Sequence, residues 1–495
     1  LNMEVLQRTA NRGSISTGYD IDNSLKFERS GGGEHVRTSD QAVGNKKTWT
    51  FSAWLKRTQL GQDYSCVFGS GYTNIQFMDN DKLRVVLYDG SNSRYADTDQ
   101  VFRDTSAFYH IVIALDSTQG TASDRVKIYI NGVRVTSFSN TTYTNMSQND
   151  EFGLGYAGSD GSERWLRLGD FFAGSEGFSG YMSDVYYLNG TAEDADAFGE
   201  FDGDSGIWIP KKYTGSGFGT QGFKYEFKDS SALGTDTSGE GHDANGLNNI
   251  TAANQATDTP TNNFCTLMPP QVSITGTATT VSEGGTQMTG GSTGSQNAFG
   301  SIGVRKGKWY FESNVSNLAG VASYNFMFGV IAADKTTAIS NGTANYIGQI
   351  ANTWGFTSNN RGTTGGTENP NFPSETATSG TTEVMGIALD MDNGKIWVHK
   401  AGTYATNNSS VTGNPATGAA PQYDNLLTST DEHILVGGGV YTQTSAAQRN
   451  MNFGNPMSTN FTNVGTHSDA NGYGSFAYAP PTGYYALCTK NLAEF

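Results

Sequence analysis

The sequence predicts an all-β protein that contains two β-sandwiches in tandem. The first observation is a strand-turn-strand unit that occurs twice, at residues 109–135 and 383–402, with Ile-Ala-Leu-Asp in both copies. The second is composition: 63 glycines and an aromatic content of 12% suit turns and strands, whereas charged residues make up only 16%. The third is a series of short alternating segments separated by turn residues, which is typical of sandwiches.

The repeated unit predicts how each of its limbs packs. In the first copy the leading limb is almost continuously apolar, as in a strand that is covered on both faces. The second limb alternates Val126, Ile128 and Ile130 with more polar residues, which predicts one buried side and one wet side. In the second copy, Asn393-Gly394 predicts a type I′ hairpin turn, because both central residues of that turn need positive φ.

The chain is too long for one ordinary core, so two or three domains are expected. We expect an N-terminal arm at 1–18, a first sandwich at 19–210, a loop-rich connector at 211–299, a second sandwich at 300–460 and a C-terminal tail at 461–495 that packs back on the domains. The acidic stretch at 193–200 is the clearest helical candidate. The expected strands are 24–29, 48–56, 66–68, 74–78, 83–88, 165–169, 178–188, 223–227, 307–315, 325–332, 351–356 and 433–441, together with the two repeated hairpins.

The charge balance argues against polyanionic partners. The formal net charge is −16, from 31 basic and 47 acidic residues. Long-range repulsion disfavours nucleic acid and anionic membranes, although one basic patch can survive on an acidic protein. No apolar run reaches the roughly 20 residues that cross a bilayer, and no basic-then-apolar signal segment opens the chain. We therefore expect folding in a reducing cytoplasm.

The cysteines predict neither a disulfide framework nor a metal site. Cys66, Cys265 and Cys488 lie far apart, are odd in number and lack metal-ligand spacing. We interpret them as free thiols packed in the core.

Two stretches resemble known families. Residues 19–188 resemble the laminin-G/pentraxin group of concanavalin-A-like jelly rolls, and residues 300–454 resemble a SPRY domain, another concanavalin-A-like sandwich. The first resemblance is carried by the segments 24–27, 51–56, 126–133 and 178–185, and the second by 307–312, 328–330, 384–400 and 452–454. Together they imply two tandem concanavalin-A-like jelly-roll β-sandwiches with a loop-rich connector.

The whole layout also resembles tail-fibre or virion-surface proteins of marine tailed bacteriophages. The segments that carry this resemblance are Phe-Gly-Glu-Phe-Asp at 198–202, Pro-Lys-Lys-Tyr at 210–213, Asn-Phe-Cys-Thr-Leu at 263–267 and Ala-Leu-Cys-Thr-Lys at 486–490. The resemblance implies a virion-surface protein assembled in the host cytoplasm, with other virion proteins as partners. It also implies a homo-oligomer, for which a trimer is common in phage fibres, although no heptad repeat specifies one.

The sequence offers no catalytic constellation. A retaining glucanase of this fold needs two carboxylates about 5 Å apart, and no Glu-x-Asp-x-x-Glu run supplies them. Neither a Gly-x-Ser-x-Gly elbow nor metal-spaced histidines occur, and we interpret His110 and His399 as structural. The nearest acid clusters are interpreted as solvated turn residues: Asp79 and Asp81, Asp194 and Asp196, and Asp202 and Asp204. A glycan-degrading depolymerase, with carboxylates paired only in space, stays open as an alternative.

No resident metal is predicted, but bound Ca²⁺ also stays open. Some laminin-G and pentraxin modules hold this ion at one rim with acidic and amide side chains. Asp116, Asp124, Asp160 and Asp170 are the candidate rim acids. The run 390–394 resembles the start of an EF-hand loop, but its place in a hairpin marks it as an ordinary turn.

Binding is therefore the leading functional hypothesis. A sugar-binding site needs an aromatic platform for the apolar face of a pyranose ring, with polar groups around it for the hydroxyls. The candidate ligand-binding aromatics, expected in loops, are Tyr95, Tyr156, Trp165, Tyr346 and Trp354. We expect a non-enzymatic virion protein, a tail fibre or spike or a capsid decoration, that binds host-surface glycan. A purely architectural virion subunit is the rival, and a secreted lectin is disfavoured by the missing signal segment.

Overall fold

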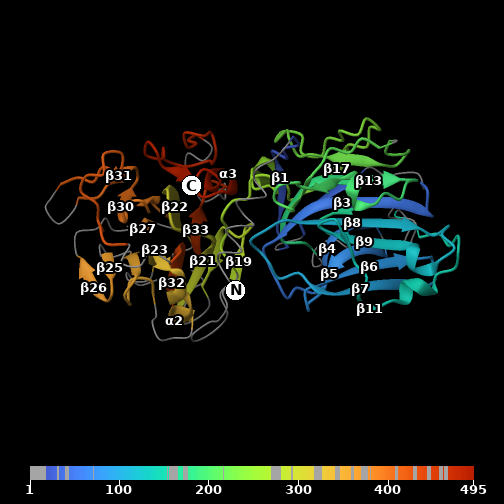
Figure 1. Ribbon diagram of the computed structural model, residues 1–495, viewed down its shortest axis with the longest axis horizontal. Helices are drawn as coiled ribbons and strands as arrows, with labels where there is room; N and C mark the ends of the chain where they lie inside the picture. The colour runs from blue at the N-terminus through green and yellow to red at the C-terminus, as the bar shows by residue number, and fades with distance from the viewer. Residues whose placement is uncertain are drawn as a thin grey trace. The chain divides into compact units, whose positions relative to one another are not determined.

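The computed structural model describes residues 18–29, 33–38, 44–70, 72–152, 154, 165–170, 177–215, 217–268, 280–290, 294–316, 326–340, 346–357, 362–369, 377–378, 381–406, 411–426, 432–442, 448–455, 461 and 466–495. The chain divides into two units between Asn263 and Phe264, here called the N-terminal unit and the C-terminal unit. Figure 1 follows both by residue number from blue to red.

The N-terminal unit consists of two antiparallel sheets around one core, with β3, β8 and β13 in one and β5, β6 and β7 in the other (Figure 1). Sheet 1 runs in the order β10 (Val133–Arg134), β9 (Val126–Ile130), β8 (Tyr109–Asp116), β3 (Thr48–Arg57), β13 (Gly180–Asn189), β1 (Ser24–Phe27) and β18 (Gln255–Ala256), and β16 (Phe223–Tyr225) pairs with β13. Sheet 2 runs in the order β11 (Phe138–Asn140), β7 (Ser93–Val101), β6 (Lys82–Tyr88), β5 (Thr73–Phe77), β4 (Ser65–Ser70), β12 (Arg167–Leu168), β2 (His35–Thr38) and β17 (Ala244–Asn248). A separate ribbon pairs β14 (Gly199–Phe201) with β15 (Trp208–Pro210).

The C-terminal unit is built in the same way. Sheet 3 runs in the order β19 (Thr280–Ser282), β20 (Gln287–Thr289), β33 (Gln448–Asn452), β22 (Lys308–Ser316), β29 (Met385–Asp390), β30 (Lys395–Lys400) and β31 (Thr403–Tyr404). Off this path, β28 (Thr381–Thr382) and β34 (Tyr485–Ala486) pair with β22, and β27 (Ala377–Thr378) pairs with β28. Sheet 4 runs in the order β21 (Gly294–Val304), β32 (Ile434–Thr442), β23 (Phe326–Ala332), β24 (Thr353–Thr357), β25 (Gly362–Thr364) and β26 (Thr367–Asn369). The described helices are short: α2 (Thr336–Ser340), α3 (Thr489–Leu492) and the 3-10 turns η1 (Ala122–Asp124), η2 (Thr142–Asn145), η3 (Ala195–Ala197), η4 (Ala252–Asn254) and η5 (Ala333–Lys335).

The two copies of Ile-Ala-Leu-Asp occupy equivalent strands. The order β3-β8-β9-β10 in sheet 1 matches the order β22-β29-β30-β31 in sheet 3. The first copy lies on β8, which pairs with β3 and with its hairpin partner β9. The second copy lies on β29, which pairs with β22 and with its hairpin partner β30. The all-β fold class with tandem sandwiches is therefore confirmed.

The outer faces of sheets 1 and 3 are closed by later parts of the chain. Phe198, Trp208 and Tyr213 pack with Trp54 and Tyr186 on the outside of sheet 1. In the C-terminal unit, residues 466–495 and the start of the unit cover sheet 3: Phe264, Tyr310, Trp397, Phe476 and Tyr484 form one cluster. The red chain end with α3 lies beside β22 in Figure 1. Each closed sheet is thus buried on both faces.

Four short segments, 198–202, 210–213, 263–267 and 486–490, belong to these covers. Residues 198–202 and 210–213 contribute Phe198 and Tyr213 to the cover of sheet 1. The segments 263–267 and 486–490 pair with each other, because Phe264 forms a bridge with Cys488 and the Cys265 amide donates to the Leu487 carbonyl at 3.0 Å. Their common role is to close the outer face of a sheet.

Several sequence-based expectations differ from the structure. The Asn393-Gly394 turn is not type I′, because only Gly394 has positive φ in a four-residue loop. The Asp390 carboxylate accepts hydrogen bonds from the backbone amides of Asp392 and Asn393, and the rest of 390–394 is the ordinary turn that was expected. The two-residue turn with positive φ at both positions occurs instead at Asn131-Gly132, between β9 and β10.

The expected helix at 193–200 is only the 3-10 turn η3, which runs directly into β14. The second limb of the first hairpin also differs, since Tyr129 is only 8% exposed under the cover of sheet 1. The expected connector 211–299 is divided, because residues up to Asn263 supply β16, β17 and β18 to the N-terminal unit, whereas the C-terminal unit begins at Phe264.

All three cysteines are buried free thiols, as expected. Among the described helices, none is long and apolar enough to span a membrane.

Candidate functional site

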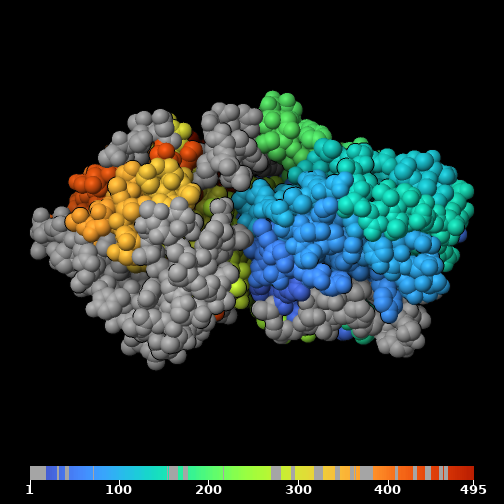
Figure 2. All heavy atoms as spheres, turned by 90° about the horizontal axis from the view of Figure 1, so that it is seen from below, coloured from blue at the N-terminus to red at the C-terminus, as the bar shows by residue number. Residues whose placement is uncertain are grey.

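The four outer faces differ in chemistry among the described residues. Sheets 1 and 3 are closed by aromatic covers. The outside of sheet 4 carries an apolar cluster made of Phe299, Ile331, Ile339, Ile347 and Leu435. The outside of sheet 2 instead carries arginine, amide, carboxylate and aromatic side chains. We call it the polar face, and Figure 2 shows the N-terminal unit from a side where the blue and teal chain, which includes β4 to β7 and β11, forms the surface.

Strand alternation places these side chains outward. Ile75 and Phe77 of β5 belong to the core, so Asn74 and Gln76 point to the other side. The same argument applies along β6, β7 and β2. One row of directly opposed positions crosses six strands: Arg37 (β2), Arg167 (β12), Gly69 (β4), Asn74 (β5), Val86 (β6) and Tyr95 (β7). Because neighbouring strands lie about 4.8 Å apart, this row is about 24 Å long.

A second row lies two residues further along the strands. Gln76, Arg84 and Asp97 occupy directly opposed positions on β5, β6 and β7. Arg84 forms a bidentate pair with Asp97, with Nε–Oδ1 at 2.8 Å and Nη2–Oδ2 at 2.7 Å. This pair raises the pKa of Arg84, and the nearby phenols of Tyr95 and Tyr64 add to the effect. The second row is therefore charged but locally neutral.

Aromatic side chains border the polar face at both ends. The Arg37 guanidinium lies 4.0 Å from the ring centroid of Trp165. At the other end, Arg84 lies 5.0 Å from the ring of Tyr95. The rings of Tyr72 and Tyr88 contact each other at 4.8 Å, and Tyr72 is 44% exposed. The arrangement alternates flat rings with planar hydrogen-bonding groups.

Two buried amide side chains at the centre of the polar face have oxygen atoms that accept no hydrogen bond among the described residues. Asn74 and Gln76 are only 4% and 3% exposed. Among the described residues, Oδ1 of Asn74 and Oε1 of Gln76 accept no hydrogen bond. A buried acceptor without a donor costs about 1–3 kcal/mol. These two oxygens are therefore buried acceptors whose hydrogen-bonding capacity is unused among the described residues.

A neutral imidazole lies at the β2 end. Burial lowers the pKa of His35, and the positive charges of Arg167 and Arg37 lower it further, while Asp170 opposes this. The His35 Nδ1 and Asp170 Oδ2 atoms are 3.7 Å apart. The positive charge at this end is therefore carried by the two guanidinium groups.

A family comparison places this face in a known kind of domain. Residues 30–196 match the model of the concanavalin A-like lectin/glucanases superfamily, in its laminin G group. The N-terminal unit carries a concanavalin A-like domain. No curated protein matches the sequence.

Solved structures with similar folds share little sequence with this chain. The SPRY domain of human HERC1 is 15% identical over 37% of this chain and 96% of that chain, with a TM-score of 0.27. A putative carbohydrate binding protein from Bacteroides ovatus is 15% identical over 46% of this chain and 60% of that chain, with a TM-score of 0.33. A heptameric SAP-like pentraxin from Limulus polyphemus is 15% identical over 36% of this chain and 80% of that chain, with a TM-score of 0.26.

Of the candidate aromatics from the sequence, the concanavalin A-like domain places Tyr95 and Trp165 on the polar face, at its two ends. Trp354 is a correction: it lies on β24 rather than in a loop, is 2% exposed and belongs to the core of the C-terminal unit. Tyr346 lies half-buried in the C-terminal unit. Tyr156 lies outside the described residues.

Most residues of the polar face are not predicted from the sequence. Tyr64, Tyr72, Tyr88, Asn74 and Gln76 are not among the predicted site residues, although Tyr88, Asn74 and Gln76 fall in expected strands. The signal that could have found them is the alternation of amides with Ile75 and Phe77, which places both amides on one side of the strand.

The candidate calcium-binding acids do not converge. No group of three or more His, Cys, Asp or Glu side chains is placed to hold a metal ion within the part of the chain that the structure describes. Asp116 accepts the Thr118 amide at 3.0 Å, and Asp124 pairs with Arg134 at 2.8 Å. Asp170 faces His35, and Asp160 lies outside the described residues.

The strongly perturbed groups elsewhere are enclosed. His110 is 1% exposed, accepts the Trp208 indole N–H at 2.9 Å and stacks on Trp54 at 4.7 Å between ring centroids. Burial lowers the pKa of His110, and likewise that of His399, to about 3. Both imidazoles therefore stay neutral and bind the covers to sheets 1 and 3.

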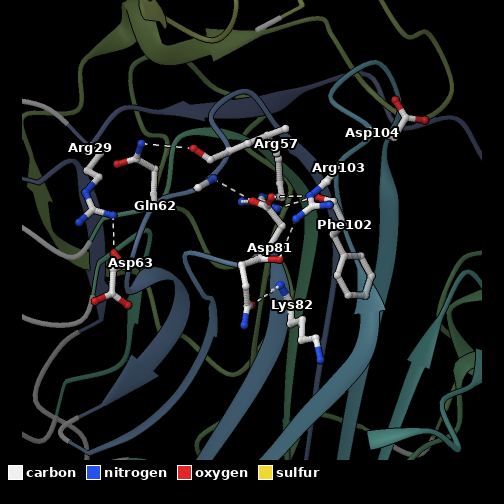
Figure 3. Close-up of polar contacts among 12 residues, drawn as sticks. Arg29, Arg57, Gln62, Asp63, Asp81, Lys82, Phe102, Arg103 and Asp104 are labelled. Atoms are coloured by element: carbon white, nitrogen blue, oxygen red, sulfur yellow. Dashed lines mark hydrogen bonds and ion pairs between the residues drawn. The ribbon is translucent and has the colours of Figure 1, made fainter. Parts of the chain in front are cut away.

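Asp81 holds a partly buried ion-pair network at one end of the domain (Figure 3). It accepts Arg57 Nη2 at 3.1 Å, Arg103 Nε at 2.8 Å and the Gly61 amide at 2.8 Å. Arg57 is fully buried at the end of β3, so the network connects sheet 1 to the β5–β6 turn of sheet 2. The interpretation of Asp81 as a solvated turn residue is thus wrong, because it is 5% exposed; its neighbour Asp79 is exposed.

The Asp81→Asn variant is expected to be less stable than the native protein at neutral pH. Its free energy of unfolding is also expected to fall less when the pH is lowered. Burial alone would raise the pKa of Asp81, but the Gly61 amide and the two guanidinium groups hold it below its ordinary value. The contribution of Asp81 to the free energy of unfolding is then present above its unfolded pKa and is lost as the pH falls below about 4. Urea unfolding should show a loss of about 1–3 kcal/mol for D81N at neutral pH. The matched variant D79N should change stability by less than about 0.5 kcal/mol, and equal effects of the two would contradict the network.

Proposed function

We propose that the protein binds glycan on the polar face of its concanavalin A-like domain and does so without catalysis. The observation that carries the proposal is the pair of buried amide oxygens, Asn74 Oδ1 and Gln76 Oε1. They accept no hydrogen bond from a described residue, and they lie between two sets of aromatic rings. A sugar offers hydroxyl donors around its edge and an apolar C–H face. The amides would accept from the hydroxyls, while Trp165 and Tyr95 would contact the ring faces.

Comparison within the chain supports the choice of this face. The equivalent outer face in the C-terminal unit is apolar, with Ile331 and Leu435 under a cap that contains Ile339 and Ile347. Such a cluster offers a sugar no hydrogen-bonding group. The polar face is therefore a feature that the N-terminal unit does not share with its counterpart.

The carboxylates of the polar face support a non-enzymatic role. Hydrolysis of a glycosidic bond needs two carboxyl groups about 5–9.5 Å apart. Asp97 lies on β7 and Asp170 follows β12, with β4, β5 and β6 between them. Four strand spacings separate them by about 19 Å, and Asp97 is already held by Arg84.

The setting that we propose is a virion surface, where the glycan would belong to the host cell. This part of the proposal is supported by the resemblance of the layout to phage virion proteins. The rival is a purely architectural virion subunit, in which the same face would contact other virion proteins rather than glycan.

Binding of host-surface polysaccharide to the purified full-length chain tests the proposal. Affinity electrophoresis should show saturable binding that EDTA leaves unchanged. Trp165→Ala and Tyr95→Ala should each weaken it about 10-fold, through the loss of one ring contact. Phe201→Ala, which removes an aromatic side chain that is 54% exposed elsewhere in the N-terminal unit, is the control and should bind like the native protein. No binding by well-folded native protein would leave the architectural subunit as the better reading.

A further inference from the structure

Arg37 carries a positive charge that no described residue pairs with in an ion pair. Its side chain is half-buried against Trp165, and its Nε atom has no hydrogen-bond partner. No carboxylate among the described residues lies within ion-pair distance of it. Gly246 on the neighbouring strand β17 makes room for this side chain, because a Cβ at that position would lie 2.9 Å from Nε. The guanidinium is thus held in place with hydrogen-bonding capacity left over.

A second guanidinium lies on the adjacent strand. Arg167 is directly opposite Arg37 in the register of β12 and β2, and it is 5% exposed. Like charges at opposed positions on neighbouring strands repel each other. Both also act on the same imidazole, that of His35. This end of the polar face therefore holds two guanidinium groups near one buried carboxylate, that of Asp170, on a chain whose net charge is −16.

We infer that the glycan bound by the polar face is acidic, with a carboxylate or sulfate group held by Arg37 beside Arg167. The inference rests on the proposed function, since it names the chemical class of ligand for the same face. Guanidinium groups donate paired hydrogen bonds that match carboxylate and sulfate oxygens. Trp165 under Arg37 would align the sugar ring that carries the acid.

The length of the polar face indicates an extended chain rather than one terminal sugar. Arg37 and Trp165 lie at the β2 end, whereas Tyr95 lies on β7. The row between them spans about 24 Å. A single acidic sugar could contact only one end, while an internal stretch of a polysaccharide would contact both.

The test compares acidic and neutral polysaccharides with the full-length chain. Polygalacturonate supplies carboxylates, κ-carrageenan supplies sulfate esters, and dextran and laminarin are neutral; random-sequence DNA is a polyanion without sugar acids. Arg37→Gln removes the charge at the site. Lys212→Gln removes one positive charge from an exposed residue outside the polar face and is the matched control.

At least one acidic polysaccharide should bind about 10-fold more tightly than the neutral ones, and R37Q should lose that preference while K212Q keeps it. The better of the two acidic ligands identifies carboxylate or sulfate. Equal binding of neutral polysaccharides, or a preference that survives in R37Q, would overturn the acidic assignment but leave glycan binding intact. DNA binding as tight as that of the acidic polysaccharides would overturn the assignment to a sugar acid. Failure of every polysaccharide to bind would overturn the proposed function itself.

Discussion

Asp258→Ala is expected to destabilise the N-terminal unit by about 3–5 kcal/mol. Lys56 on β3 and Asp258 are both fully buried, with Nζ and Oδ2 at 2.8 Å, and Asn263 Oδ1 also accepts from Nζ at 2.7 Å. Without Asp258, the ammonium would stay in the interior beside the Asn263 amide and the rings of Phe108 and Tyr181, but it would lose the carboxylate that neutralises it. An uncompensated buried charge is among the costliest defects that one substitution can introduce.

The measurement is urea unfolding followed by tryptophan fluorescence. Asp194→Ala is the matched control, because it breaks the pair with Lys127, whose side chains are 30% and 51% exposed. That variant should lose less than about 1 kcal/mol. The double variant Lys56→Met with Asp258→Leu should recover most of the loss, since both charges are then gone. A loss below about 1 kcal/mol for D258A would contradict the importance of the pair.

The Lys56–Asp258 pair also shows why sequence patterns predict the end of the first sandwich at the wrong place. The segment that contains β17 and β18 is polar, with Ala-Asn-Gly-Leu-Asn at 244–248. β17 lies at the edge of sheet 2 and is held there by its pairing with β2, so its sequence does not need a regular apolar period. Its attachment depends on long-range contacts such as Lys56 with Asp258, which no local pattern records.

Strand alternation predicts which residues share a face, but not what covers that face. Residues 74–78 were correctly expected as a strand, and so were the two repeated hairpins. The alternation of β9, however, placed Tyr129 on a wet side, while the chain folds a cover over it. The same limit explains Trp354, an aromatic in a polar stretch of sequence whose strand turns it into the core.

Turn acids posed a similar problem. Asp79 and Asp81 occupy one turn and have the same chemistry, yet only Asp81 meets Arg57, which lies 24 positions away in the sequence. With φ at 64°, Asp81 directs its carboxylate under the turn rather than away from it. The partner of a carboxylate decides its role, and that partner comes from another strand.

The two units share one strand order in sheets 1 and 3, but their other sheets present different surfaces. Sheet 3 repeats the order of sheet 1, and in both a buried histidine lies under the cover. The second sheets have diverged: sheet 2 presents arginines and amides, whereas sheet 4 presents isoleucine and leucine with glycines at 437–439. The ligand-binding proposal therefore belongs to one unit, and substitutions in the other should act on stability.

Glu312 is where the C-terminal unit should respond most strongly to pH. Its carboxylate accepts four hydrogen bonds, from the Tyr310 hydroxyl, the Asn452 amide group and the backbone amides of Ala477 and Tyr478. Through these contacts β22 holds the covering segment. Burial raises the pKa of Glu312 to about 7, although the four donors lower it.

The sign of the pH effect follows from this shift. The pKa of Glu312 is higher in the folded than in the unfolded state. Its contribution to the free energy of unfolding is therefore present below about pH 4.5 and is lost as the pH rises through about 7. Urea unfolding of the full chain should therefore show the transition of the C-terminal unit weaken by about 3 kcal/mol between pH 4.5 and pH 8. Glu312→Gln keeps the shape without the titration, so its unfolding free energy should vary much less over that range. Equal stability of the native protein at both ends of the range would mean that the four donors fully offset the cost of burying the charge. In that case E312Q, rather than the native protein, would be the less stable of the two at pH 8, because its amide N–H groups would face N–H donors.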